Sequence, residues 1–283
     1  MAELLKGAPV ADAINARSQN DLARLLELGV TPTLALLRVG EREDDIAYEN
    51  GAVKRCEKVG VAVSRVTLPE NVTQSELIET VMRLNSDDGI HGVLIFMPLP
   101  RHLDGEAVRR ALSPEKDVDG ITDGSLAGVF TGSSVGFAPC TAQACIEILD
   151  HYGIDCTGKR AAVIGRSLVV GKPVSMLLMA KNATVTICHT RTLDLPSVTR
   201  QADIVIAAAG RAGAVGASHL SATQTLIDVG INFIDGKMCG DVDFAAAEPV
   251  VHALTPVPGG VGTVTTSVLV SHVVEAAKRC CGM

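Results

Sequence analysis

Residues 161–180, which read AAVIGRSLVVGKPVSMLLMA, decide the fold. Residues 159–165 form a mostly apolar run that ends in glycine, as buried strands often do, and residues 173–180 follow as a helical pattern with Pro173 near its first turn. A turn between a strand and a helix places backbone N–H groups and the helix dipole where a pyrophosphate can bind. Gly165 and Gly171 are six residues apart, so the pattern is not G-x-G-x-x-G, and two glycines flanking a structural turn are the alternative.

Three more strand-like runs follow this turn at intervals of about twenty residues. They cover residues 183–188, 203–208 and 225–229. Strands that return to one sheet through crossovers make a doubly wound nucleotide-binding domain. Their order therefore weighs against the purely structural interpretation of the turn.

The first half of the chain also alternates strands and helices. Apolar residues at helical spacing predict helices over 11–28, 44–58 and 75–84, the last capped by Thr73 or Ser75. Short apolar runs predict strands over 34–40, 61–66 and 92–97. This alternation predicts an α/β fold with mainly parallel sheets, divided into residues 1–138 and 139–264. A last helix over 265–279 is expected to pack back on the first domain, so that residues 265–283 belong to it.

Composition and charge exclude several classes of protein. The 283 residues carry a net charge of −7, whereas nucleic-acid binding needs clustered Lys and Arg. Apolar runs such as residues 92–100 are too short to span a bilayer, and residues 1–7 include Glu3 and no sustained apolar stretch. The eight cysteines form no C-x2-C pair, so free thiols are expected rather than a zinc site. These features predict a cytoplasmic protein with no metal and no nucleic-acid or membrane partner.

The segment after the second strand of the nucleotide-binding half favours NADP over NAD. NAD-selecting domains carry an Asp or Glu about twenty residues after the glycines, where it binds the ribose 2′-hydroxyl. Here residues 188–192 read CHTRT, with no acid before Asp194. Arg166 and Arg191 could neutralise a 2′-phosphate, and Thr190 could donate a hydrogen bond to it. The alternative is that both arginines are merely solvated.

Six stretches in order carry a resemblance that covers essentially the whole chain. They are residues 116–120 (KDVDG), 139–141 (PCT), 163–173 (VIGRS and VGKP), 182–186 (NATVT), 228–232 (DVGIN) and 255–262 (TPVPGGVG). On these motifs the chain resembles the bifunctional methylenetetrahydrofolate dehydrogenase/methenyltetrahydrofolate cyclohydrolase family. The resemblance implies an amino-terminal three-layer α/β folate domain, a Rossmann-like NADP domain, a cleft between them and a homodimer.

The resemblance also implies the site residues. The implied catalytic residues are Tyr48 and Asp119. The implied substrate-binding residues are Tyr48, Phe96, Met97, Pro98, Leu99, Asp119, Pro258, Gly259 and Gly260. The implied cofactor-binding residues are Gly165, Arg166, Ser167, Val170, Gly171, Pro173, His189, Thr190, Arg191, Ala209, Gly210 and Ile231.

Two positions depart from the family pattern of Y-x-x-x-K on a helix and Q-L-P-L-P after a strand. The lysine position is Ala52, and the glutamine position is Phe96. Lys54 is no obvious substitute, because six residues turn a helix by about 240° from Tyr48. Position 52 is expected on the same helix face as Tyr48, toward the cleft, where alanine would leave a gap.

These departures bear unequally on the two reactions. Oxidation removes a hydride from a carbon held between two nitrogens, and mainly needs the nicotinamide to be aligned with it. Hydrolysis needs a positioned acid or base, which Ala52 and Phe96 cannot provide. The sequence therefore predicts NADP-dependent oxidation of 5,10-methylenetetrahydrofolate to 5,10-methenyltetrahydrofolate without efficient cyclohydrolase activity. The alternatives are a fully bifunctional enzyme that forms 10-formyltetrahydrofolate, and a non-catalytic folate- or nucleotide-binding paralogue, which the retained cofactor half argues against.

Overall fold

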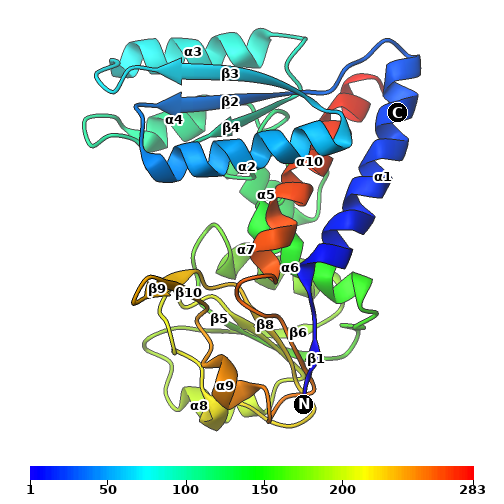
Figure 1. The fold of residues 1–283 in the computed structure, drawn as a ribbon, viewed down its shortest axis with the longest axis vertical. Helices are drawn as coiled ribbons and strands as arrows, with labels where there is room; N and C mark the ends of the chain where they lie inside the picture. The colour runs from blue at the N-terminus through cyan, green and yellow to red at the C-terminus, as the bar shows by residue number, and fades with distance from the viewer. The chain divides into compact units, whose positions relative to one another are not determined.

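The computed structural model describes residues 1–283 and divides them into two compact units (Figure 1). The six-stranded unit comprises Met1–Asp12 and Thr141–Thr265, and the three-stranded unit comprises Ala13–Cys140 and Thr266–Met283. The helices α1 (Gly7–Glu27), α6 (Cys140–His151) and α10 (Val261–Cys280) each contribute residues to both units. None of the helices combines the length and apolarity needed to cross a bilayer.

The six-stranded unit is a wholly parallel sheet in the order β1-β11-β8-β7-β5-β6. Its strands are β1 (Glu3–Leu4), β5 (Arg160–Ile164), β6 (Thr184–Cys188), β7 (Ile204–Ala207), β8 (Thr225–Asp228) and β11 (Ala253–Leu254). The chain leaves β5 for β6 on one side and then crosses to β7 on the other. The carboxyl ends of β5 and β7 therefore flank a topological switch point, where open α/β sheets bind their ligands.

Shorter elements complete this unit. They are α7 (Gly171–Ala180), α8 (Leu195–Arg200), the 3-10 turn η1 (Ala217–His219), α9 (Phe244–Ala247) and the antiparallel hairpin β9 (Asn232–Ile234) and β10 (Lys237–Cys239). A buried cluster that includes Ile164, Val205 and Leu226 joins the central strands to the residues that follow them.

The first twelve residues lie elsewhere than expected. They were expected in the amino-terminal domain, whereas β1 pairs in parallel with β11 through Glu3–Ala253 and Leu4–Leu254. A two-residue edge strand has no periodicity to detect, so its sheet depends on its partner. The carboxyl-terminal residues 266–283 group with the three-stranded unit.

The three-stranded unit has the parallel order β3-β2-β4, with β2 (Thr33–Val39), β3 (Ala62–Leu68) and β4 (Gly92–Ile95). Its helices besides α1 and α10 are α2 (Glu43–Val59), α3 (Gln74–Ser86), α4 (Gly105–Ala111) and α5 (Asp123–Thr131). Thr73 caps α3 in a reciprocal capping box with Glu76.

Three layers result from the alternation of side chains along β2. Leu37 and its same-face neighbours pack against α3 and α4, and Leu34 and Leu36 are buried on the opposite face, where α2 lies (Figure 1). The helices and strands predicted from apolar periodicity are all present, and the largest differences are that the helices expected over 11–28 and 265–279 begin four residues earlier, at Gly7 and Val261.

Candidate active site

The turn after β5 requires both of its glycines. Gly165 has φ 130°, and a Cβ there would collide with the carbonyl of Ala208, which follows β7. A Cβ on Gly171, the first residue of α7, would collide with the carbonyl of Gly165. Ser167 Oγ accepts hydrogen bonds from the backbone N–H of Val170 (3.1 Å) and Gly171 (3.4 Å). The backbone is therefore folded tightly at the switch point, directly before the amino-terminal end of α7.

The loop after β6 brings two cations to the same sheet edge. Gly165 donates to the Cys188 carbonyl at 2.9 Å, so Arg166 and Arg191 leave neighbouring strands at the same end. The loop is held by its own atoms, because His189 N–H donates to Thr192 Oγ1 (2.9 Å) and Arg191 N–H to His189 Nδ1 (3.2 Å). Both guanidinium groups are exposed and make no hydrogen bond or ion pair within the chain.

Two buried carboxylates organise the loops after β7 and β8. Asp228 accepts from the backbone N–H of Gly230 (3.0 Å), Asp241 (2.9 Å) and Val242 (3.1 Å). Asp241 in turn accepts from Gly210 N–H at 2.8 Å and Asn232 Nδ2 at 2.9 Å. Burial raises the pKa of Asp228 to about 6, and the backbone N–H groups lower it in part.

This network lies directly beneath three residues predicted to bind the cofactor. Ala209 and Gly210 follow β7, Ile231 follows β8, and all three are exposed. Asp241 ties these two loops together, and sequence reasoning missed it. The only signal was its position in the acidic stretch 241–243, which is unlike any ligand-binding pattern.

In the three-stranded unit, Tyr48 contacts Phe96. Tyr48 comes from α2 and Phe96 follows β4; their ring centroids are 6.1 Å apart at 81°, an edge-to-face pair worth about 0.5–1.5 kcal/mol. Phe96 is buried, whereas Tyr48 remains 39% exposed. Phe96 therefore holds the tyrosine ring in a defined orientation with its other side open. Met97 and Pro98, joined by a cis peptide bond, follow on the surface.

Ala52 differs from its expected environment. We expected it on the open face with Tyr48, with a gap above it, but its exposed fraction is 0%. The reason is that Asp45, Glu49, Ala52 and Cys56 form the buried stripe of α2, and Tyr48 lies at the edge of that stripe. Lys54 is exposed on the outer side of the helix, as its spacing predicted.

Asp119 lies in an environment that strongly shifts its pKa. Burial first, and the nearby charge of Asp117 second, raise the pKa of Asp119 to about 7, and a hydrogen bond with Cys140 lowers it in part. Burial, Asp119 and Cys140 in turn raise the pKa of Tyr48. A carboxyl group, a phenol and a thiol therefore gather at one place.

The two acids of the KDVDG motif have different environments. Asp117 is fully buried and accepts hydrogen bonds from Ile121 N (3.0 Å), Thr122 N (2.7 Å) and Ser125 Oγ (2.6 Å). Three donors satisfy Asp117 as a structural group, whereas Asp119 retains unused acceptor capacity. This difference supports Asp119 as the acid that binds a ligand.

The carbonyl between these two acids anchors the adjoining segments. Cys140 Sγ donates to the Val118 carbonyl at 3.2 Å, and His272 Nδ1 of α10 lies 2.9 Å from the same oxygen. His272 also stacks on Phe137, with ring centroids 4.9 Å apart. Sequence reasoning did not single out His272, because a lone histidine on an amphipathic helix carries no motif.

The predicted substrate loop at residues 258–260 belongs to the six-stranded unit. Pro258 and Gly259 are exposed, Gly260 is buried, and the Val257–Pro258 peptide bond is cis. Gly7, the first residue of α1, donates to the Gly259 carbonyl at 2.8 Å, and a Cβ on Gly7 would collide with the Gly260 carbonyl. This glycine-rich loop is therefore fixed by close backbone packing.

Comparison with known proteins agrees with both halves of this description. Residues 5–119 match the catalytic-domain model of tetrahydrofolate dehydrogenase/cyclohydrolase, and residues 139–281 match the NAD(P)-binding-domain model of the same enzymes. The chain belongs to the tetrahydrofolate dehydrogenase/cyclohydrolase family. The resemblance predicted from the six motifs is confirmed, as is the two-part α/β fold.

Relatives of this family cover nearly the whole chain. The bifunctional protein FolD of Carboxydothermus hydrogenoformans is 48% identical over 281 residues, 98% of each chain, and that of Clostridioides difficile is 47% identical over 277 residues, 98% of this chain and 96% of its own. The crystal structure of the bifunctional enzyme from Campylobacter jejuni superposes with a TM-score of 0.95 at 36% identity, covering 99% of both chains. The Trypanosoma brucei enzyme, solved with NADP and an inhibitor, superposes with a TM-score of 0.91 at 34% identity, covering 100% of this chain and 99% of its own.

Proposed function

We propose that this tetrahydrofolate dehydrogenase/cyclohydrolase family member oxidises 5,10-methylenetetrahydrofolate to 5,10-methenyltetrahydrofolate with NADP. The observation that carries the proposal is the tight turn at the switch point, which lies beside the unpaired Arg166 and Arg191. The other unit of the chain places Tyr48 near Asp119, the acid that would bind the substrate. One trypanosomal relative was solved with NADP.

The residues of the six-stranded unit fit NADP. The turn at Gly165–Gly171 stands at the amino-terminal end of α7, where the helix dipole favours the pyrophosphate. Arg166 and Arg191 would pair with the 2′-phosphate, with Thr190 exposed beside them. Ala209–Gly210 and Ile231, held by Asp241, would border the nicotinamide side. The bound cofactor supplies a hydride acceptor, which no side chain can provide.

The residues of the three-stranded unit support binding of the folate. Asp119 would accept hydrogen bonds from the N–H edge of the pterin, because pairing with those donors offsets the cost of its burial. Tyr48, oriented by Phe96, would pack against the substrate with its exposed ring face. The chemical step needs alignment rather than a proton carrier, because the two flanking nitrogens stabilise the cation that hydride loss creates.

We propose that cyclohydrolase activity is weak, for a local reason. Position 52 is a fully buried alanine and position 96 a buried phenylalanine. Neither side chain can donate or accept the proton that hydrolysis transfers, or adjust the pKa of a group that does. A bifunctional enzyme is the second candidate, favoured by the names of the relatives and by one feature of the site. Asp119, whose pKa is raised to about 7, exchanges its proton near neutral pH and lies close to Tyr48.

The test compares the wild type with variants that restore a lysine. Ala52→Lys with Phe96→Gln should raise the enzyme-dependent decay of methenyltetrahydrofolate measured without NADP. Burial of position 52 makes this variant prone to unfolding, so Gly51→Lys is the companion variant, since a Cβ at Gly51 meets nothing within 4 Å. If the wild type already hydrolyses rapidly and loses this with Asp119→Asn, the bifunctional candidate holds instead.

We further propose that the chain acts as a homodimer in the cytoplasm. The hairpin β9–β10 exposes apolar side chains, namely Phe233 (67%), Ile234 (55%) and Met238 (41%). Such a cluster is typical of an interface that is covered by another chain. All eight cysteines are free thiols, as a reducing compartment allows. Sedimentation or light scattering on the purified chain measures the oligomeric state directly.

A further inference from the structure

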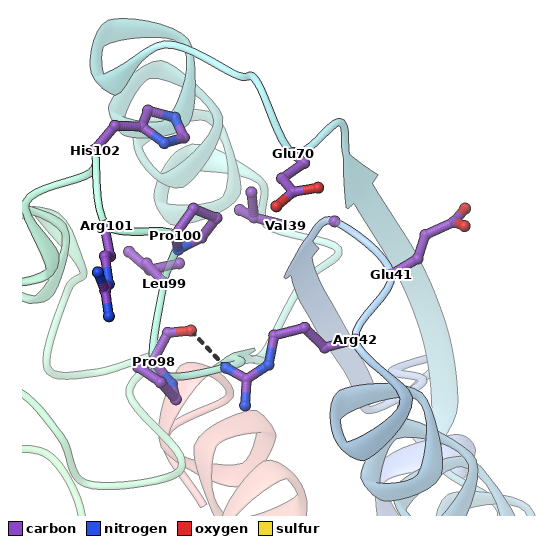
Figure 2. A pocket seen from close by; sticks show the side chains of 10 residues that line it. Val39, Glu41, Arg42, Glu70, Pro98, Leu99, Pro100, Arg101 and His102 are labelled. Carbon is purple, nitrogen blue, oxygen red and sulfur yellow. Dashed lines mark hydrogen bonds between the residues drawn. The ribbon is translucent and has the colours of Figure 1, made fainter.

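Two segments without regular secondary structure carry residues of the proposed folate site, and side chains from helices anchor both. Arg42, which precedes α2, donates from Nη1 to the Pro98 carbonyl at 3.0 Å, two residues beyond Phe96 (Figure 2). The segment that carries Asp119 lies between α4 and α5. Its anchor is His272 of α10.

The carbonyl groups of residues 116–119 all accept hydrogen bonds, but their donors differ in kind. Backbone N–H groups bond to three of them, those of Lys116, Asp117 and Asp119. The carbonyl of Val118 instead accepts from two side chains, Cys140 Sγ at 3.2 Å and His272 Nδ1 at 2.9 Å. A substitution at position 272 can therefore loosen this carbonyl without breaking a backbone hydrogen bond.

The Val118 carbonyl fixes the position of Asp119, because the two residues share one peptide plane. The oxygen of Val118 lies in the same rigid plane as the N–H and the Cα of Asp119. The side chain of Val118 is held as well, since a Cβ added to Gly92 of β4 would lie only 2.6 Å from its Cγ1. The direction in which the Asp119 side chain leaves the backbone therefore depends on the two donors at the Val118 oxygen.

The imidazole ring of His272 is itself held in one orientation. It stacks on Phe137, with ring centroids 4.9 Å apart and an interplanar angle of 30°. The guanidinium carbon of Arg279, two turns further along α10, lies 4.3 Å from the centroid of the Phe137 ring. Because a carbonyl oxygen only accepts, Nδ1 of His272 carries the proton in its contact with Val118. His272 is therefore an oriented donor.

We propose that His272 is a positioning residue of the folate site: its Nδ1–H holds the Val118 carbonyl and thereby directs the Asp119 carboxyl group toward the pterin. This role deepens the proposed function and rests on it. His272 does not contact the substrate and acts only through Asp119. Removal of the donor should weaken folate binding about 5- to 10-fold, the usual effect of one hydrogen bond. The Kd for NADP should not change, because the residues proposed to bind it belong to the other unit.

A pair of variants separates the hydrogen bond from the packing of the ring. His272→Asn keeps an N–H donor on the atom that corresponds to Nδ1 and loses the stacking, whereas His272→Phe keeps a ring against Phe137 and has no donor. The Kd for tetrahydrofolate, measured by calorimetry, should stay within about twofold of the wild type in His272→Asn and rise about 5- to 10-fold in His272→Phe. Ser271→Ala, which removes only a hydroxyl bonded to the Val268 carbonyl of the same helix, is the matched control and should bind like the wild type.

The Asp119→Asn background shows whether His272 acts through Asp119. In that background His272→Phe should change the Kd for tetrahydrofolate less than about twofold, because the charged acceptor that it positions is gone. The Tm is recorded for every variant, and His272→Leu is a second donor-free variant in case His272→Phe does not fold. Equal weakening by the donor-free variant in both backgrounds would overturn the inference. So would a His272→Asn protein that binds as poorly as the donor-free one.

The proposed oxidation and the role of His272 fail in different ways. A wild type that binds tetrahydrofolate with this dependence on His272, but reduces no NADP with methylenetetrahydrofolate, would refute the oxidation and leave the role of His272 intact. Normal NADP reduction together with a donor-free variant that binds tetrahydrofolate like the wild type would refute the role of His272 and leave the oxidation intact.

Discussion

Replacing Asp119 by asparagine should stabilise the protein while inactivating it. Asp119 is half-buried, and its pKa is raised from 3.8 to about 7, mainly because its partial removal from solvent disfavours the charged form. A shift of about three units corresponds to about 4 kcal/mol at most, since one unit is about 1.4 kcal/mol. Asparagine keeps the shape and the acceptor for Cys140 but has no charge to bury.

The difference in free energy of unfolding between Asp119→Asn and the wild type should depend on pH. Well below pH 3.8, at about pH 2–3, aspartate is neutral in both the folded and the unfolded chain, so burying its charge no longer distinguishes the two proteins. As the pH rises from there to about 7, the unfolded wild type loses its proton before the folded state does, which lowers the free energy of unfolding of the wild type only. Above about pH 7 the difference is constant and favours Asp119→Asn.

Urea unfolding at about pH 5 and at about pH 8 measures the effect. The stability advantage of Asp119→Asn should widen between the two values and reach about 2–4 kcal/mol at the higher one. The same variant should lose most NADP reduction while its NADP affinity, measured by calorimetry, stays near that of the wild type. Asp117→Asn is the matched control, because three donors satisfy that carboxylate and its replacement should destabilise at both pH values. An Asp119→Asn protein that is active, or whose stability advantage is the same at both pH values, would refute the assignment of Asp119.

Three further variants test other parts of the molecule. Arg166→Ala or Arg191→Ala should raise the Kd for NADP about tenfold and leave that for NAD nearly unchanged, because only a 2′-phosphate loses a charged partner; an equal loss for both cofactors would contradict the NADP assignment. Asp241→Asn should weaken NADP binding and raise hydrogen exchange in the loops after β7 and β8, since Gly210 and Asn232 lose a charged acceptor. Unchanged exchange in these loops would show that they keep their structure without the Asp241 carboxylate. Phe233→Asp should shift the chain from dimer to monomer in light scattering without unfolding it, and a dimer that persists would place the interface elsewhere.

The sequence predicted most of the long helices and strands, because their apolar periodicity is strong and local. It could not place β1, β11 or the β9–β10 hairpin, because two- and three-residue strands take their structure from their partners. Position 52 shows a second limit. Spacing alone put it on the face of Tyr48, whereas 0% exposure shows that it belongs to the buried stripe, since the boundary between stripe and open face depends on what packs against the helix. Asp241 shows a third, because the network of buried carboxylates joins loops that are distant in sequence.

Following both products of a single reaction tests most directly whether this enzyme oxidises its substrate without hydrolysing the product. Purified protein is supplied with 5,10-methylenetetrahydrofolate and NADP, and the formation of NADPH and of methenyltetrahydrofolate is recorded together. We predict that methenyltetrahydrofolate accumulates in step with NADPH and then decays only at the rate of the enzyme-free solution, because Ala52 and Phe96 carry no proton to the hydrolysis. NADPH formation without accumulation of methenyltetrahydrofolate would show rapid enzymatic hydrolysis and contradict this account.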